Sequence, residues 1–223
     1  MFLGCSSLST VDGNLSPLTN GAYMFYKCTA LSTFNSDLSS LTYGHNMFRK
    51  CTSLTSFDSD LSSLTDGQDM FRNCTNLVEF GSDLKYLTDG GSMFRDCTSL
   101  TTFDSDLISP ETKKSSLTKG SSMFFGCSKL TTFNADLSSL TDGSSMFYDC
   151  NKLTAFNSTL SFLTAGNSMF HGCKLNATSV KNILDTLPTN TSSSYKTITI
   201  GIDVSNDDTK PQQLLKFVQD INP

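Results

Sequence analysis

The sequence is poor in the residue types on which most enzymes and nucleic-acid-binding proteins depend. It contains no Trp, only two His, and 16 Lys and Arg residues against 21 Asp and Glu residues, for a formal net charge of −5. A negative charge argues against nucleic-acid binding, because that affinity comes largely from neutralising phosphates. No nucleophile, base and acid are recognisably grouped. We therefore expect a protein that is not an enzyme and needs no cofactor.

Long hydrophobic runs are also missing. No apolar stretch approaches the roughly 18 residues that a membrane-spanning helix requires, so membrane insertion is not expected. The first residues, from Met1 to Cys5, lack the basic and apolar regions of a signal peptide. Ser and Thr take the place of charged residues and make up more than a quarter of the 223 residues. This composition excludes classes of function without indicating a ligand.

A repeat of 23 residues organises most of the chain. Each of the eight Met residues is followed directly by Phe and, four positions after the Met, by one of the eight Cys residues. Successive Met residues lie 23 positions apart, except across one gap of 30 that contains a seven-residue insertion at 108–114. A period of this length indicates a solenoid in which each unit forms one coil. We expect the insertion to form a loop that leaves the coil.

The spacing of these residues also carries a family resemblance. The segment 54–74 reads L-T-S-F-D-S-D-L-S-S-L-T-D-G-Q-D-M-F-R-N-C and resembles the BspA-like leucine-rich repeats of bacterial surface proteins. The resemblance covers about residues 1–175. It implies a leucine-rich-repeat solenoid, mainly of β structure with short α or 3₁₀ turns.

The resemblance also implies a function and a location. It suggests a non-enzymatic binding or adhesion module, extracellular or at a cell surface, that recognises a protein or a glycan there. An alternative of another class is a structural or receptor-binding component of a phage virion or tail, whose faces contact sister subunits. The sequence leaves both interpretations open.

Each position in the repeat has an expected role. In one unit, Leu54 and Phe57 are expected to face the core, while Ser56 and Asp58 point outward by strand alternation. The residue two after the recurring Phe is small, which we expect to let the coil close. The recurring Gly is expected to adopt a positive φ. The M-F-x-x-C segment is expected to form one turn of α or 3₁₀ helix.

The recurring cysteines and acidic residues invite metal-binding interpretations, which we weigh against structural ones. The cysteines occupy one equivalent core position, so we favour a ladder of reduced thiols over disulfides. Close Cys pairs of the kind that bind zinc are absent from the sequence. Recurring Asp and Asn residues can cap turns, which we favour over calcium binding because the glycine-rich nonapeptide pattern is missing.

Two surfaces are candidates for ligand binding. The first, here called the stripe, consists of residues two after each Met and combines arginines with aromatic residues, as protein-binding hot spots do. Its members are Tyr26, Arg49, Arg72, Arg95, Phe125 and Tyr148. The second, here called the sheet face, consists of the small, polar and acidic residues Thr33, Asn35, Ser56, Asp58, Glu79, Thr102, Asp104, Thr132 and Asn134. We favour the stripe for a protein or anionic partner and the sheet face for a hydrogen-bonded, glycan-like partner.

The repeat pattern ends near residue 175. We therefore divide the chain into a solenoid at 1–175 and a C-terminal helix–strand–helix cap at 176–223. The spacing of apolar residues predicts helices over 175–187 and 210–221, with a strand between them over 196–204. At the other end, the first residues are already in register with the repeat. Because an open coil would expose apolar core, we expect a longer polypeptide before Met1 or another chain covering this coil.

Overall fold

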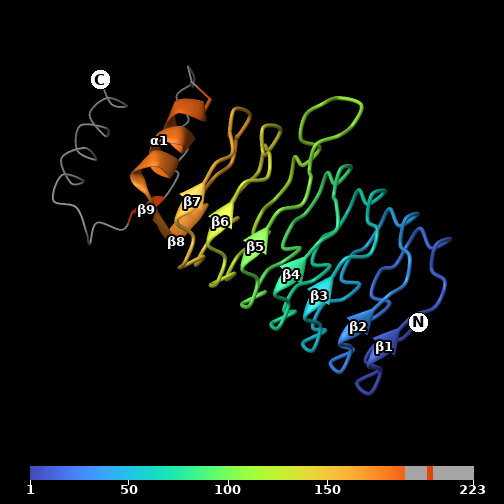
Figure 1. Ribbon diagram of the computed structural model, residues 1–223. Coiled ribbons are helices and arrows are strands. Elements are labelled where there is room, and N and C mark those ends of the chain that lie inside the picture. The colour runs from blue at the N-terminus through green and yellow to red at the C-terminus, as the bar shows by residue number, and fades with distance from the viewer. Residues whose placement is uncertain (189–199, 203–223) are drawn as a thin grey trace.

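The computed structural model describes residues 1–188 and 200–202 and shows successive coils stacked side by side into an elongated solenoid (Figure 1). The short equivalent strands pair in parallel within three separate sheets, for example with Val11 opposite Phe34 and Phe57 opposite Phe80. The seven repeat strands are β1 Thr10–Val11, β2 Thr33–Phe34, β3 Ser56–Phe57, β4 Glu79–Phe80, β5 Thr102–Phe103, β6 Thr132–Phe133 and β7 Ala155–Phe156. After them come β8 Phe170–Leu175, α1 Ala177–Thr186 and β9 Ile200–Ile202. The predicted solenoid is therefore confirmed.

Hydrogen bonds between coils are concentrated away from these short strands. A second set of parallel bridges runs without interruption from Asn20 to Ala165, through the residue that precedes each recurring Gly. Beyond that residue, alternate N–H groups donate to carbonyls of the following coil, as Phe25 N does to Met47 O at 2.9 Å. We call this edge of the solenoid, from the recurring Gly to Cys, the turn edge.

The turn edge is built from tight turns in place of the expected turn of helix. Within one coil, Met24 N donates to Gly21 O and Cys28 N donates to the carbonyl three residues earlier, both at 3.0 Å. The residues just before and three after each Met have positive φ, for example Asn46 at 56° and Lys50 at 65°. A helix cannot continue through such left-handed residues, which explains the difference.

The recurring Gly allows close packing between coils, and the expectation of a positive φ is wrong. None of these glycines from Gly21 to Gly166, all within the described residues, has a positive φ. A Cβ atom added to Gly21 would lie 2.5 Å from the sulfur of Met47, which belongs to the next coil. The glycine is required because that methionine fills the space beside its Cα atom.

Two columns of phenylalanine rings run through the core. Rings of the first column stack at centroid distances of 5.3–5.5 Å. Its members are Phe2, Phe25, Phe48, Phe71, Phe94, Phe124, Phe147 and Phe170. The second column, Phe34, Phe57, Phe80, Phe103, Phe133 and Phe156, meets the first edge to face. Both arrangements are favourable for aromatic pairs, so the columns hold the coils in register.

The side-chain directions predicted around the recurring Phe are confirmed. Leu54 and Phe57 are buried, whereas Ser56 and Asp58 are exposed. Ser59, the small residue two after the Phe, is buried as well. This alternation places the polar residues of the sheet face on the outside of the coil.

Helix α1 covers the last coil with buried apolar residues, Val180 and Ile183, and with polar side chains. Asn176 caps the helix by accepting a hydrogen bond from Ser179 N at 2.8 Å. Ser179 Oγ accepts from Phe156 N at 2.8 Å, and Asn182 Nδ2 donates to Ser158 O at 2.9 Å. These contacts satisfy strand-edge groups that would otherwise lack partners.

The predictions for the C-terminal region are met only where the structure describes it. Helix α1 lies within the range predicted to be helical, and β9 lies within the predicted strand and pairs in parallel with β8. The rest of that strand and the second predicted helix, 210–221, lie outside the described residues. The division of the chain at residue 175 therefore stays a prediction.

The insertion at 108–114 projects beyond the neighbouring coils as a loop (Figure 1). An antiparallel bridge between Ile108 and Ser115 closes it, and Ser109 N donates to Lys114 O at 2.9 Å. Glu111 accepts hydrogen bonds from Tyr86 and from Ser109. The loop is thus hydrogen-bonded to the preceding coil through Tyr86.

Candidate functional site

The stripe lies along the turn edge, and the structure stacks its members in two groups, Tyr26 with Arg49 and Arg95 with Phe125 and Tyr148. The guanidinium of Arg49 lies 5.9 Å from the ring centroid of Tyr26, and that of Arg95 lies 4.1 Å from the ring centroid of Phe125. The rings of Phe125 and Tyr148 stack at 4.7 Å with an interplanar angle of 2°. Every member is partly exposed. The stripe is therefore a row of partly exposed planar groups, with stacking at both of its ends.

Neighbouring side chains of the same turns hold the arginines in place. Arg72 and Arg95 each lie near an aspartate, with N–O distances of 3.0 and 3.6 Å. Arg49 Nη1 instead donates to the neutral amide oxygen of Asn46 at 2.9 Å. Fixed side chains lose less rotamer entropy on binding. Of the three arginines, Arg49 is therefore the one whose polar neighbour is uncharged.

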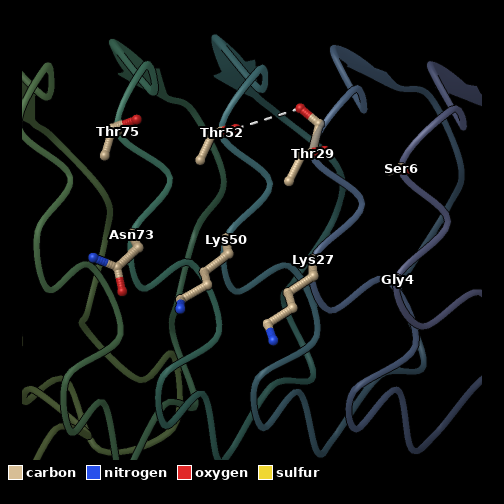
Figure 2. A pocket seen from close by; sticks show the side chains of 8 residues that line it. All are labelled: Gly4, Ser6, Lys27, Thr29, Lys50, Thr52, Asn73 and Thr75. Carbon is tan, nitrogen blue, oxygen red and sulfur yellow. Dashed lines mark hydrogen bonds between the residues drawn. The ribbon is translucent and has the colours of Figure 1, made fainter.

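A groove of about 550 Å³ runs beside the stripe across the first four coils (Figure 2). It is lined by Gly4, Ser6, Lys27, Thr29, Lys50, Thr52, Asn73 and Thr75. Figure 2 shows two rows of side chains, one with Lys27, Lys50 and Asn73 and the other with the threonines. Among the described residues, no carboxylate lies within 4.0 Å of either lysine ammonium.

Aromatic side chains gather next to the groove. The ring of Tyr23 lies 6.0 Å from that of Tyr26 and 5.6 Å from that of His45, which in turn lies 5.9 Å from Tyr43. Tyr23 is 40% exposed and Tyr43 is 37% exposed. The ammonium of Lys27 lies 5.2 Å from the Tyr26 ring centroid. Lys27 thus belongs both to the groove and to the surroundings of the aromatic cluster.

Sequence reasoning missed the groove and this cluster. The available signal was the pairing of Lys at three positions after Met with Thr at five positions after Met, in the units of Met24 and Met47. Only the stacking of the coils in the structure shows that the column three after Met and the column five after Met border one groove.

The sheet face is exposed along β2 to β5, as expected, and partly exposed at Thr132 of β6, and it is acidic. A shallow hollow of about 260 Å³ is lined in part by Asp104 and Asn134 of this face, together with Asp106 and Asp136. The hollow's lining residues include no Lys or Arg. This surface therefore disfavours anionic ligands.

Seven of the eight cysteines form a ladder of buried free thiols. Each donates its S–H to a Phe carbonyl at 3.0–3.2 Å, as Cys74 does to Phe48 O. Burial raises the pKa of the Cys74 and Cys97 thiols well above the ordinary value. Cys5 is exposed, which corrects the expectation that all eight lie in the core. The first coil has no neighbour to cover it in the described chain.

This ladder predicts how the thiols react. In native protein we expect one cysteine, Cys5, to react rapidly with a thiol reagent such as DTNB and the other seven to react slowly, because buried thiols with raised pKa values supply little thiolate. Denaturation without reductant should release all eight. Rapid labelling of several native thiols, or fewer than eight after denaturation, would contradict the ladder.

Several of the recurring acidic residues cap turns. Oδ1 of Asp37, Asp60 and Asp106 each accepts a backbone N–H from two residues further on, at 2.8 Å. This is the capping role favoured from the sequence. Within residues 1–188 and 200–202, no group of three or more His, Cys, Asp or Glu side chains is placed to hold a metal ion. In the same residues, no helix has both the length and the apolar character to cross a membrane.

Comparisons with known proteins agree with this architecture. The family model described as the BspA type leucine rich repeat region matches residues 1–101 and 90–199, in six copies. Among solved structures, a leucine-rich repeat protein of T. pallidum is similar, with a TM-score of 0.55 at 18% identity over 85% of this chain and 81% of that one. A leucine-rich cell surface protein of Faecalibacterium prausnitzii matches with a TM-score of 0.45 at 17% identity, over 83% of this chain and 52% of that one. No curated protein sequence matches the chain.

Proposed function

Because the chain belongs to the BspA-type leucine-rich repeat family, we propose that it is a non-enzymatic binding module that acts at a cell surface and recognises its ligand through the turn edge. The stacked stripe is the observation that carries this proposal. Leucine-rich repeats supply extended surfaces, and this one presents arginine and aromatic side chains held in fixed positions. The comparisons offer no support for a virion component, so that alternative is not developed.

The stripe suits a binding role better than the sheet face does. Arg and Tyr contribute more binding energy at protein interfaces than Ser and Thr do. Contacts such as that of Arg95 with Phe125 also keep the side chains ordered before a ligand arrives. The sheet face offers mostly short polar side chains on a flat surface, from which less binding energy is expected.

A paired set of variants tests this assignment. Arrays of extracellular proteins and glycans are first probed with the wild-type chain, and each ligand found is measured by biolayer interferometry. The stripe variant carries Arg49→Ser, Arg72→Ser and Arg95→Ser. We expect it to bind at least about tenfold more weakly, because it loses desolvated charged contacts, with a melting temperature close to that of the wild type.

The matched control carries Asp58→Ser, Glu79→Ser and Asp104→Ser on the sheet face. It should bind within about twofold of the wild type, since those residues lie away from the turn edge. If the control loses binding and the stripe variant retains it, the ligand uses the sheet face. If the wild-type chain binds nothing on either array, the binding function itself is wrong.

A further inference from the structure

We propose that the groove beside the stripe binds an anionic glycan, a polysaccharide that carries sulfate or carboxylate groups. This inference rests on the proposed binding function and specifies the class of ligand. The groove spans the first four coils, and the cations that line it are Lys27 and Lys50. Three features of the groove favour such a ligand: its charge, its hydrogen-bonding groups and the neighbouring aromatic cluster.

Charge favours an anion at this place on an otherwise acidic protein. Lys27 and Lys50 have no carboxylate within 4.0 Å in the described part of the chain. In later coils the equivalent position, three after Met, is occupied by Asp96 and Asp149. At this position lysine therefore occurs only in the coils of Met24 and Met47, where an anionic ligand is attracted, and aspartate replaces it in two later coils.

The spacing of the cations suits a polymer with regularly placed anionic groups. Equivalent residues of successive coils are separated by about one strand spacing, roughly 4.8 Å. In Figure 2 the side chains of Lys27 and Lys50 extend in the same direction from adjacent coils. Two neighbouring ammonium groups can thus contact one sulfate or carboxylate, or adjacent groups along a chain.

The remaining lining groups can form hydrogen bonds with a sugar. The hydroxyls of Thr29, Thr52 and Thr75 can form hydrogen bonds to sugar hydroxyls. So can the amide oxygen of Asn73, whose Nδ2 donates to Asp96 Oδ2 at 3.3 Å. Thr52 Oγ1 donates to Thr29 O at 3.4 Å, which leaves its oxygen lone pairs free to accept. None of the lining residues that the structure describes has a purely apolar side chain.

Exposed aromatic rings complete the site. Tyr23 and Tyr43 are partly exposed and contact His45, so their rings are held in place. A tyrosine ring offers an apolar face with a polar edge, which fits the C–H face and hydroxyls of a sugar ring. Because the cluster reaches the groove through Tyr26 and Lys27, one oligosaccharide can contact both.

Interferometry with defined probes tests the proposal on the whole chain. The probes are heparin-derived oligosaccharides for sulfate, hyaluronan for carboxylate, neutral dextran, and polyglutamate as an acidic peptide. We expect binding to heparin fragments, to hyaluronan or to both, weakening as sodium chloride is raised, and no binding to dextran. The variant Lys27→Gln with Lys50→Gln should bind the glycan about tenfold more weakly, because it loses two charge-assisted contacts.

The matched control is Lys129→Gln with Lys152→Gln, which makes the same change in net charge at two exposed positions in other coils. It should bind within about twofold of the wild type, and both double variants should melt near the wild-type temperature. The inference is overturned if neither anionic glycan binds, if polyglutamate binds as tightly as the glycans, or if both double variants lose affinity equally. If a ligand found on the arrays needs the stripe arginines and tolerates the loss of Lys27 and Lys50, the proposed function stands and this inference fails.

Discussion

Replacing Phe94 by Ala is expected to lower the free energy of unfolding by about 3–5 kcal/mol. The Phe94 side chain is fully buried in the first aromatic column. Its ring stacks on Phe71 and Phe124 at 5.5 and 5.4 Å and meets Phe80 and Phe103 edge to face at 4.8 and 5.5 Å. The substitution loses these contacts and leaves a cavity between coils that cannot close without breaking the ladder of hydrogen bonds. Equilibrium denaturation in urea measures the change.

Phe2→Ala is the matched control in the same column. Phe2 is 44% exposed and stacks on one ring, that of Phe25. Because less apolar surface is buried there, we expect a loss of about 1 kcal/mol or less. Similar losses for the two variants would mean that the column does not stabilise the solenoid through stacking along its length.

Gly44→Ala is expected to destabilise the protein by about 1–3 kcal/mol through overpacking. The new Cβ atom would lie 2.8 Å from the sulfur of Met70 and 3.3 Å from Cδ1 of Leu64. Met70 is fully buried, so its side chain can move away only by displacing other core atoms. Thermal and urea unfolding should both report the loss.

Two further variants separate this clash from a general effect of alanine. Gly13 has no atom within 4 Å of an added Cβ, and its φ is not positive. Gly13→Ala should therefore be neutral or slightly stabilising. The double variant Gly44→Ala with Met70→Ala should be less destabilised than the sum of its single variants, because the smaller side chain removes the clash. Strict additivity would show that Gly44 does not act through Met70.

The solenoid could be predicted from the sequence because the residues that are buried recur with the same period as the sequence repeat. Leu54 and Phe57 recur in every unit as apolar residues, and a coil has one interior in which such residues can be buried. The helix near Ala177–Thr186 could be predicted for a related reason: its apolar spacing differs from that of the repeat, and Asn176 is a favourable N-cap.

The backbone of the turn edge could not be predicted in the same way. Whether Gly21 turns with a positive φ or makes room for Met47 depends on a side chain 26 positions away in the next coil. The left-handed residues such as Lys50 are polar residues at fixed offsets from Met, but their conformation follows from hydrogen bonds to the neighbouring coil. Local preference alone does not favour a lysine at such a position.

The candidate site shows the same division. The stripe was found because arginine and aromatic residues recur in one column of the sequence. The groove depends on two columns, and the cluster of Tyr23, Tyr43 and His45 depends on residues before the Met in two different coils. Only the stacked structure shows that these side chains surround the same surface.

Chemical-shift mapping tests most directly whether the turn edge binds the ligand. The ¹⁵N-labelled chain would be titrated with a heparin-derived oligosaccharide and followed by two-dimensional ¹H–¹⁵N spectra. We predict that shifts concentrate on the backbone amides of Lys27 and Lys50 on the turn edge and of Thr29 and Thr52 directly after it. The amides of the sheet face, such as that of Glu79, should be unchanged. Shifts concentrated on the sheet face, or no shifts at all, would contradict the account.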